Sequence, residues 1–224
     1  MNYPEIRELM CDIGRRVWQQ GWAASNDGNF TAKLDEGLFL TTPTGISKGF
    51  MTPDMLILVD SSCRVLEKSK LRPSTELPMH IRCYKERPDI GAVVHAHPPV
   101  ATAFAVAHIP LDSYTMPEAI IALGSVPIAP YGCPSTDEVP ESIAPFLHEH
   151  DAILLENHGA ITVGKDLLTA YYRMETLEYY AKLTMNTRLL GQAFELPEHR
   201  LEELMDLRNQ FNYSGKHPGI KKYR

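Results

Sequence analysis

The sequence predicts one mixed α/β domain in which helices cover a central, largely antiparallel sheet. Its 224 residues, 44% of them hydrophobic, suit a globular chain with one packed core. Helix-like and strand-like periodicities interleave along the chain. Near the start, three short strand-like segments follow one another with turns between them, which is typical of an antiparallel meander. Together these observations favour a layered fold.

The first element is an amphipathic helix over residues 4–20, because apolar residues recur there at helical spacing and Gly21 can end the helix. The next segments carry turn residues between short apolar or alternating runs, including a Gly/Pro-rich loop before the third run. We therefore expect strands over residues 29–34, 38–42 and 55–60.

Helices and strands alternate through the middle of the chain. Ser74 can cap a helix that runs to about Arg87, where Pro88 ends it, and a strand leads from there to His95. Further helices are expected over residues 100–107 and 135–149, and further strands over residues 126–129, 152–156 and 160–163.

The longest helical pattern runs from Asp166 to Leu190. Its apolar positions suit burial, whereas Glu175 and Glu178 suit the solvent face. Residues 214–224 are basic and rich in turn formers. We therefore expect a single domain over residues 1–213, followed by a C-terminal tail (214–224) that is either mobile or a flap over an active site.

Charge and hydropathy exclude several classes of protein. The net charge of −6 and the pI near 5.8 give no basic surface for nucleic acid or for an anionic membrane. No apolar stretch approaches the roughly 20 residues of a membrane span, and the first residues form no signal-peptide core. A cytoplasmic protein that binds neither nucleic acid nor membrane is the expectation.

Two histidines one residue apart are the strongest chemical signal. His95 and His97 end an apolar run typical of a buried strand, and their period of two places both side chains on one side. His158 ends a second apolar run and is followed at once by Gly159. Three histidines can bind one metal ion and leave a position for water or substrate, as catalytic zinc sites do.

A carboxylate and several anion-binding groups accompany these histidines. Glu76 is the candidate acid/base, because it falls in the first turn of the helix that leads to the His95 strand. Ser74 and Thr75 place hydroxyls at the start of that helix, where free N–H groups bind anions. The turns over residues 25–29 and 42–48 have the Gly, Asn and Thr content of anion-binding loops.

Simpler interpretations exist for the same residues. Ser74 can be an N-cap and Glu76 a first-turn residue favoured by the helix dipole. Gly28 and Gly45 can be turn formers only, since neither loop has the spacing of a nucleotide-binding P-loop.

Taken together, the motifs resemble those of the class II aldolase/adducin family along nearly the whole chain. Specifically, they resemble those of its small sugar-phosphate aldolases of the zinc-dependent L-fuculose-1-phosphate aldolase type. Six motifs occur in the family's order and approximate spacing: Ser25-Asn-Asp-Gly-Asn-Phe-Thr31, Thr42-Pro-Thr-Gly45, Ser74-Thr-Glu76, His95-Ala-His97, Ala129-Pro-Tyr131 and Asn157-His-Gly159.

The resemblance implies a three-layer αβα fold around an antiparallel sheet, and a C4 homotetramer with active sites between subunits. It implies Zn²⁺, with Mn²⁺ or Co²⁺ as alternatives, on His95, His97 and His158, and Glu76 as the acid/base. The implied reaction cleaves a ketose 1-phosphate reversibly to dihydroxyacetone phosphate and an aldehyde through a zinc-stabilised enediolate. The residues implied to bind the substrate phosphate are Gly28, Asn29, Thr44, Gly45, Ser74 and Thr75.

The sequence also departs from the fuculose-phosphate pattern. Where that pattern has a tyrosine that assists in a neighbouring subunit's site, this chain has Met116, with Tyr114 two residues earlier. Glu118 follows, and it resembles the acid/base of the family's methylthioribulose-1-phosphate dehydratases, although a surface or interface role is the alternative. Tyr213 is a weak match to the late tyrosine that closes over the aldolase site.

These departures leave other functions open. Within the family they are dehydration of a methylthioribulose phosphate, decarboxylation of a keto-acid phosphate and 4-epimerisation of a pentulose 5-phosphate. Glu76 argues against the epimerase, which resembles this sequence but has an aspartate there, and the dehydratases lack this glutamate. Outside enzymes, the alternative is a non-catalytic scaffold like the adducin branch, against which the three histidines and Glu76 argue.

Overall fold

A computed structural model describes residues 3–223. A seven-stranded sheet runs through it in the order β3-β2-β1-β4-β7-β6-β5, and every neighbouring pair is antiparallel except β5 and β6. The strands are β1 (Asn29–Asp35), β2 (Leu38–Thr41), β3 (Ile57–Asp60), β4 (Ala92–Ala96), β5 (Ile128–Ala129), β6 (Ala152–Leu155) and β7 (Gly159–Gly164).

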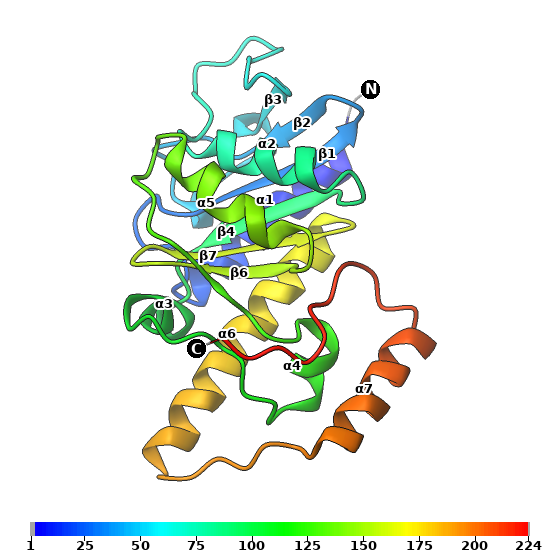
Figure 1. Cartoon of the computed structure of the whole chain (residues 1–224). Helices are drawn as coiled ribbons and strands as arrows, with labels where there is room; N and C mark the ends of the chain where they lie inside the picture. Colours follow the sequence, from blue (N-terminus) through cyan, green and yellow to red (C-terminus); the bar gives the residue numbers. More distant parts are fainter. Residues whose placement is uncertain (1–2, 224) are drawn as a thin grey trace.

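Helices cover both faces of the sheet, which confirms the three-layer αβα prediction (Figure 1). The helices are α1 (Pro4–Gln19), α2 (Leu77–Glu86), α3 (Pro99–Val106), α4 (Pro117–Ala122), α5 (Glu138–Leu147), α6 (Leu167–Leu189) and α7 (Glu198–Gln210), with short 3-10 turns η1 (Lys48–Phe50) and η2 (Pro53–Met55). One core lies between the sheet and α1, α3 and α6, and a second lies between the sheet and α2 and α5.

Alternation along β4 decides where its histidine lies. Ala92, Val94 and Ala96 face the α1/α3/α6 core, whereas Val93 faces the α2/α5 core. Since side chains alternate along a strand, His95 shares the face of Val93. Its backbone pairs with Asn29 on β1 and with Ile161 on β7, so the histidine sits in the middle of the sheet.

Several element boundaries differ from the sequence prediction. The helix expected from Ser74 begins at Leu77, with Glu76 as its N-cap residue and Pro78 in its first turn. Proline is tolerated there because the first N–H groups of a helix have no partner within it, and it marks the true start. The Ser74 hydroxyl instead accepts the Glu76 N–H at 3.2 Å. The strand expected over 126–129 keeps only two residues, and α4 and α7 were not predicted.

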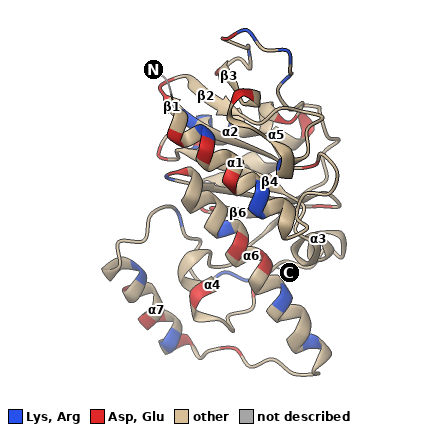
Figure 2. Ribbon diagram, turned by 180° about the vertical axis from the view of Figure 1, so that it is seen from behind, with Lys and Arg blue, Asp and Glu red and all other residues tan. Residues whose placement is uncertain are grey.

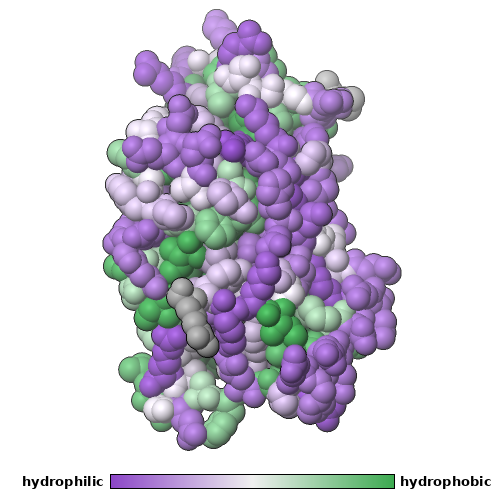
Figure 3. All heavy atoms as spheres, in the orientation of Figure 1, coloured by the Kyte–Doolittle hydropathy of each residue, from purple (hydrophilic) through white to green (hydrophobic). Residues whose placement is uncertain are grey.

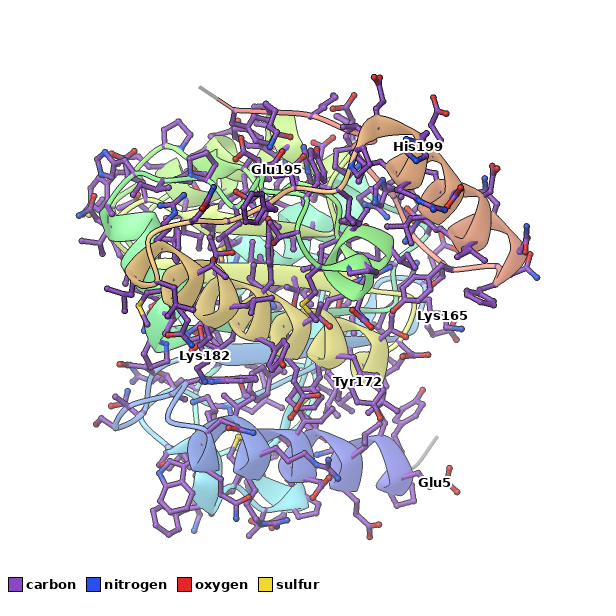
Figure 4. The ribbon with its side chains drawn as sticks, turned by 90° about the horizontal axis from the view of Figure 1, so that it is seen from below. Glu5, Lys165, Tyr172, Lys182, Glu195 and His199 are labelled. Atoms are coloured by element: carbon purple, nitrogen blue, oxygen red, sulfur yellow. The ribbon has the colours of Figure 1, made fainter. Side chains whose placement is uncertain are left out.

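α6 confirms the longest predicted helix, but one of its polar positions is buried. Asp166 caps it by accepting the N–H of Thr169. Glu178, expected on the solvent face, is 1% exposed and accepts the N–H of Ala101 at 2.8 Å. It thereby satisfies free amides at the start of α3. In Figure 4, α6 crosses between α1 and α7, with Tyr172 and Lys182 labelled along it.

The C-terminal segment packs against α4 and the end of α5. His217 Nε2 donates to the Ile120 carbonyl at 2.6 Å, and the Tyr223 hydroxyl lies 2.8 Å from His150 Nε2. α7 packs on α4 through Leu201, which contacts Ile120 in a small third cluster. Figure 1 shows this segment in red, crossing the molecule beside α4.

The surface is mainly polar. Acidic and basic residues both occur along α1, α6 and α7 (Figure 2). The face seen in Figure 3 is largely hydrophilic, with hydrophobic residues gathered in small patches. Within residues 3–223, no helix combines the length and the apolar character that a membrane span requires.

Candidate active site

Three imidazoles from two parts of the chain converge at one end of the central strands. His95 lies at the end of β4, His97 just beyond it, and His158 in the tight connection between β6 and β7. Their ligand nitrogens all lie within 4.8 Å of one another. Asn157 adopts a left-handed φ of 54° in this connection. The structure therefore brings together the three histidines that the sequence singled out.

Glycine makes this convergence possible. A Cβ on Gly159 would lie 2.5 Å from His97 Cδ2 and 2.8 Å from the Ala96 carbonyl oxygen. Gly28 has a φ of +71°, and a Cβ there would lie 3.0 Å from the His95 carbonyl. Both positions need close backbone approach, so larger residues would push the chain away from the histidines.

Glu76 lies against the same histidines. Its Oε1 is 3.2 Å from His158 Nε2, and its Oε2 is 3.5 Å from His95 Nε2. The Asn29 side-chain amide donates to Oε2 at 2.7 Å. Burial favours the neutral acid, but the contacts with His95, His158 and Asn29 outweigh it and hold the Glu76 pKa well below its usual range. The carboxylate is therefore ionised and can accept a proton.

The donor set fits a divalent metal ion. Burial lowers the pKa of His95 and His97 to about 4, so both imidazoles are neutral and can act as ligands. The Ala160 carbonyl accepts from His95 Nδ1 at 2.9 Å, which leaves Nε2 free to bind metal. His95 Nε2 and His97 Nε2 are 3.2 Å apart, close to the ~3.3–3.4 Å between two tetrahedral zinc ligands at ~2.0–2.1 Å.

A buried polar atom completes this fit. Among the described residues, Glu76 Oε1 has no hydrogen-bond partner of acceptable geometry although it is inaccessible to solvent. A buried acceptor without a partner is costly. It suits a carboxylate that faces a cation or a substrate hydroxyl.

The expected phosphate-binding residues meet in one cavity beside the histidines. This cavity has a volume of about 230 Å³. Its lining includes His97, His158, Glu76 and the predicted Gly28, Asn29, Thr44, Ser74 and Thr75. Gly45 lies in the adjoining loop, with a left-handed φ of +75°.

Two further residues of this cavity were missed in the sequence. Lys48 is 1% exposed, and its Nζ donates to the carbonyls of Asn26 at 3.0 Å and Ile46 at 2.9 Å. Burial lowers its pKa to about 8. Ser135, at a φ of +65°, donates its hydroxyl to Thr75 Oγ1 at 2.7 Å. Lys48 is the last residue of the turn over residues 42–48, but only the fold shows that its side chain returns to the cavity.

Glu118 and Tyr213 lie outside this cavity of their own chain. Glu118, in the first turn of α4, lines a separate cavity of about 360 Å³ with Glu175 and Lys182. Tyr213 is 44% exposed, and its ring centroid lies 5.2 Å from the guanidinium carbon of Arg208. No residue of segment 214–223 lines the cavity at the histidines either.

Known proteins resemble this chain in sequence and in structure. Residues 8–185 match the model of the family described as Class II Aldolase and Adducin N-terminal domain. The 3-oxo-tetronate 4-phosphate decarboxylase of Escherichia coli K12 is 34% identical over 183 residues, covering 80% of this chain and 85% of the relative. The L-fuculose phosphate aldolase of Methanococcus vannielii is also 34% identical, over 80% of this chain and 94% of the relative.

Solved structures agree. An L-fuculose 1-phosphate aldolase superposes with a TM-score of 0.84 at 27% identity, covering 95% of this chain and 99% of that one. The L-fuculose-1-phosphate aldolase of Thermus thermophilus does so with a TM-score of 0.74 at 32% identity, over 84% and 98%. With the family match over most of the sequence, these likenesses lead to one conclusion: this chain belongs to the class II aldolase/adducin family.

Proposed function

We propose that this chain is a metal-dependent carbon–carbon lyase that cleaves a ketose 1-phosphate reversibly to dihydroxyacetone phosphate and an aldehyde. The observation that carries the proposal is the Glu76 carboxylate lying 3.2 Å from His158 Nε2 and 3.5 Å from His95 Nε2, at the wall of a cavity lined by the predicted phosphate-binding residues. The proposed metal site, proton carrier and anion site would thus be adjacent.

His95, His97 and His158 would hold the metal, Zn²⁺ in the first instance and Mn²⁺ or Co²⁺ as alternatives. The bound ion supplies a Lewis acid that polarises the substrate carbonyl. The remaining work falls to the chain's own side chains.

The substrate phosphate would bind through Asn29, Thr44, Ser74 and Thr75, together with the backbone of Gly28 and Gly45. Lys48 is the one lysine or arginine among the described residues that line the cavity. Its ammonium would offset the phosphate charge, which would otherwise face the carboxylates of Asp27 and Glu76. Hydroxyls and backbone amides then fix the position of the phosphate.

Glu76 would carry the proton. In cleavage, the hydroxyl on the departing carbon would give its proton to the Glu76 carboxylate as the aldehyde forms, and the electrons of the broken carbon–carbon bond would remain with the fragment that bears the carbonyl. Glu76 would then protonate that fragment, and in synthesis it would remove the same proton.

A second candidate is decarboxylation of a 3-oxo-acid phosphate. The relatives described as 3-oxo-tetronate 4-phosphate decarboxylases, at 32–34% identity, favour it. There too a bond β to a carbonyl breaks, carbon dioxide leaves, and Glu76 would protonate the remaining carbon. A phosphorylated sugar dehydratase would require a different acid/base, for which Glu118 is the candidate.

Glu118 and Tyr213 would act across a subunit boundary. Both lie outside the cavity of their own chain, so a catalytic role requires a neighbouring subunit's site. We propose a C4 homotetramer that provides this arrangement.

The test is turnover of metal-loaded protein on three kinds of substrate: ketose 1-phosphates, 3-oxo-acid phosphates and methylthioribulose 1-phosphate. Release of dihydroxyacetone phosphate from a ketose 1-phosphate, without carbon dioxide, that is lost in Glu76→Gln and kept in Glu175→Gln would support the aldolase. Glu76-dependent carbon dioxide release would replace it with the decarboxylase, and Glu118-dependent dehydration with the dehydratase. Stoichiometric metal with no turnover would favour a scaffold and refute the proposal.

A further inference from the structure

Five side chains form one continuous hydrogen-bonded chain that ends on Glu76. The Tyr84 hydroxyl lies 2.9 Å from Thr31 Oγ1, and Thr31 Oγ1 lies 2.9 Å from His80 Nδ1. His80 Nε2 lies 2.6 Å from Asn29 Oδ1, and Asn29 Nδ2 donates to Glu76 Oε2 at 2.7 Å. The chain alternates between α2 and β1 and ends at Glu76, the N-cap residue of α2.

The Asn29 amide fixes the direction of every bond. Its NH₂ group donates to Glu76 Oε2, so its carbonyl oxygen faces His80 Nε2 and can only accept. His80 Nε2 must therefore carry a proton, which leaves Nδ1 as an acceptor. Thr31 donates to Nδ1, and its oxygen in turn accepts from Tyr84. Each donor meets one acceptor from end to end.

Burial shields these hydrogen bonds from competing water. His80 and Thr31 are each 1% exposed, Asn29 is 4% exposed and Tyr84 is 7% exposed. Burial also lowers the pKa of His80 to about 4, in agreement with a neutral ring that accepts at one nitrogen and donates at the other. Solvent has little access to replace any link.

We propose that His80 is a positioning residue for Glu76, acting through the Asn29 amide, and that Thr31 and Tyr84 hold His80 in the Nε2–H tautomer. The inference rests on the proposed function, since it concerns the carboxylate that would carry the proton. His80 itself does not line the substrate cavity, and it reaches Glu76 only through Asn29, which does.

The alternative arrangement explains why the chain matters. If Thr31 did not donate, His80 could carry its proton on Nδ1 and present a bare Nε2 to Asn29. The Asn29 amide would then turn over to donate to His80, and its carbonyl oxygen would face the Glu76 carboxylate. Two acceptors would repel each other, and Glu76 would leave the position beside the histidines.

The first test is the tautomer itself, which does not depend on activity. Long-range ¹⁵N–¹H correlation spectra of the full-length protein with ¹⁵N-labelled histidine, assigned by comparison with His80→Gln, report which nitrogen carries the proton. We expect Nε2–H at neutral pH in the wild type and a larger Nδ1–H fraction in Thr31→Val. A wild-type Nδ1–H tautomer or a charged ring would overturn the inference.

The second test separates kcat from KM. Thr31→Val should lower kcat about tenfold, within the ~10–100-fold range of outer-shell losses, while KM and the bound metal stoichiometry stay near wild type. Thr31→Ser keeps the hydroxyl and should restore most of kcat. Thr162→Val is the matched control, because Thr162 is equally buried in the same sheet but donates to the Ala170 carbonyl at 2.8 Å.

The outcomes distinguish the two proposals. Equal kcat losses in Thr31→Val and Thr162→Val would refute the positioning role while leaving the lyase intact. A wild-type protein that turns over no sugar phosphate would refute the proposed function, and the tautomer spectra would still decide the inference.

Discussion

The substitution Gly159→Ala tests the metal site through packing alone. The added Cβ would lie 2.5 Å from His97 Cδ2, whereas ordinary contact begins near 3.4 Å. The ring would have to retreat by the difference, about 0.9 Å, and metal–ligand distances tolerate only ~0.2 Å. We therefore expect metal affinity to fall at least ~10–100-fold, the loss seen when ligand support is removed.

Gly164→Ala is the matched control at the other end of β7. Its Cβ would lie 2.4 Å from the Ala170 backbone nitrogen, so it is just as crowded but far from the histidines. The assay is zinc competition with a chromophoric chelator, with thermal unfolding alongside. Both variants should lose stability, and only Gly159→Ala should lose metal affinity. Wild-type affinity in Gly159→Ala would refute the account of this site.

Three further predictions concern charge. Lys48→Met should weaken the binding of inorganic phosphate about tenfold. In the wild type, phosphate affinity should decline as the pH rises through about 8, because Lys48 loses its proton there. A phosphate affinity that stays constant from pH 7 to 9 would contradict a role of the Lys48 ammonium in phosphate binding. Asp151→Asn should cost about 3–5 kcal/mol in urea unfolding, because two buried guanidinium groups, Arg87 and Arg173, each 2.8 Å away, lose the buried carboxylate that they share. Asp89→Asn, half-exposed beside Arg87, should cost under ~1 kcal/mol, and equal losses would show that burial is not the cause.

The fold was predictable where periodicity and burial coincide. The apolar runs that form β4, β6 and β7 are continuous, and the helical pattern of α6 is long. Tertiary contacts therefore did not change the secondary structure that these patterns predict. α4 has six residues and β5 has two, too short for a period to show. Glu178 carries a carboxylate and is still buried, because free backbone amides at the start of α3 donate hydrogen bonds to it.

The candidate site was predictable where side chains end strands. His95, His97 and His158 each close an apolar run, so their meeting at the same end of neighbouring strands could be inferred. The positions of Lys48 and His80 beside the site could not be inferred, because they depend on contacts with residues that lie 22 and 51 positions away in the sequence. Residues on an exposed surface that would complete the site of a neighbouring subunit are still harder to predict from a single sequence.

Hydrogen exchange into dihydroxyacetone phosphate tests the central claim most directly. Metal-loaded protein incubated with this compound in D₂O, without an aldehyde, should place deuterium on its hydroxymethyl carbon. This carbon lies next to the carbonyl and forms the new carbon–carbon bond in synthesis. We predict exchange with the wild type, a loss of ~10²–10⁴-fold in Glu76→Gln, and wild-type rates in Glu175→Gln. Exchange that persists unchanged in Glu76→Gln, or none with the wild type, would contradict the assignment of Glu76 as the proton carrier of an aldolase.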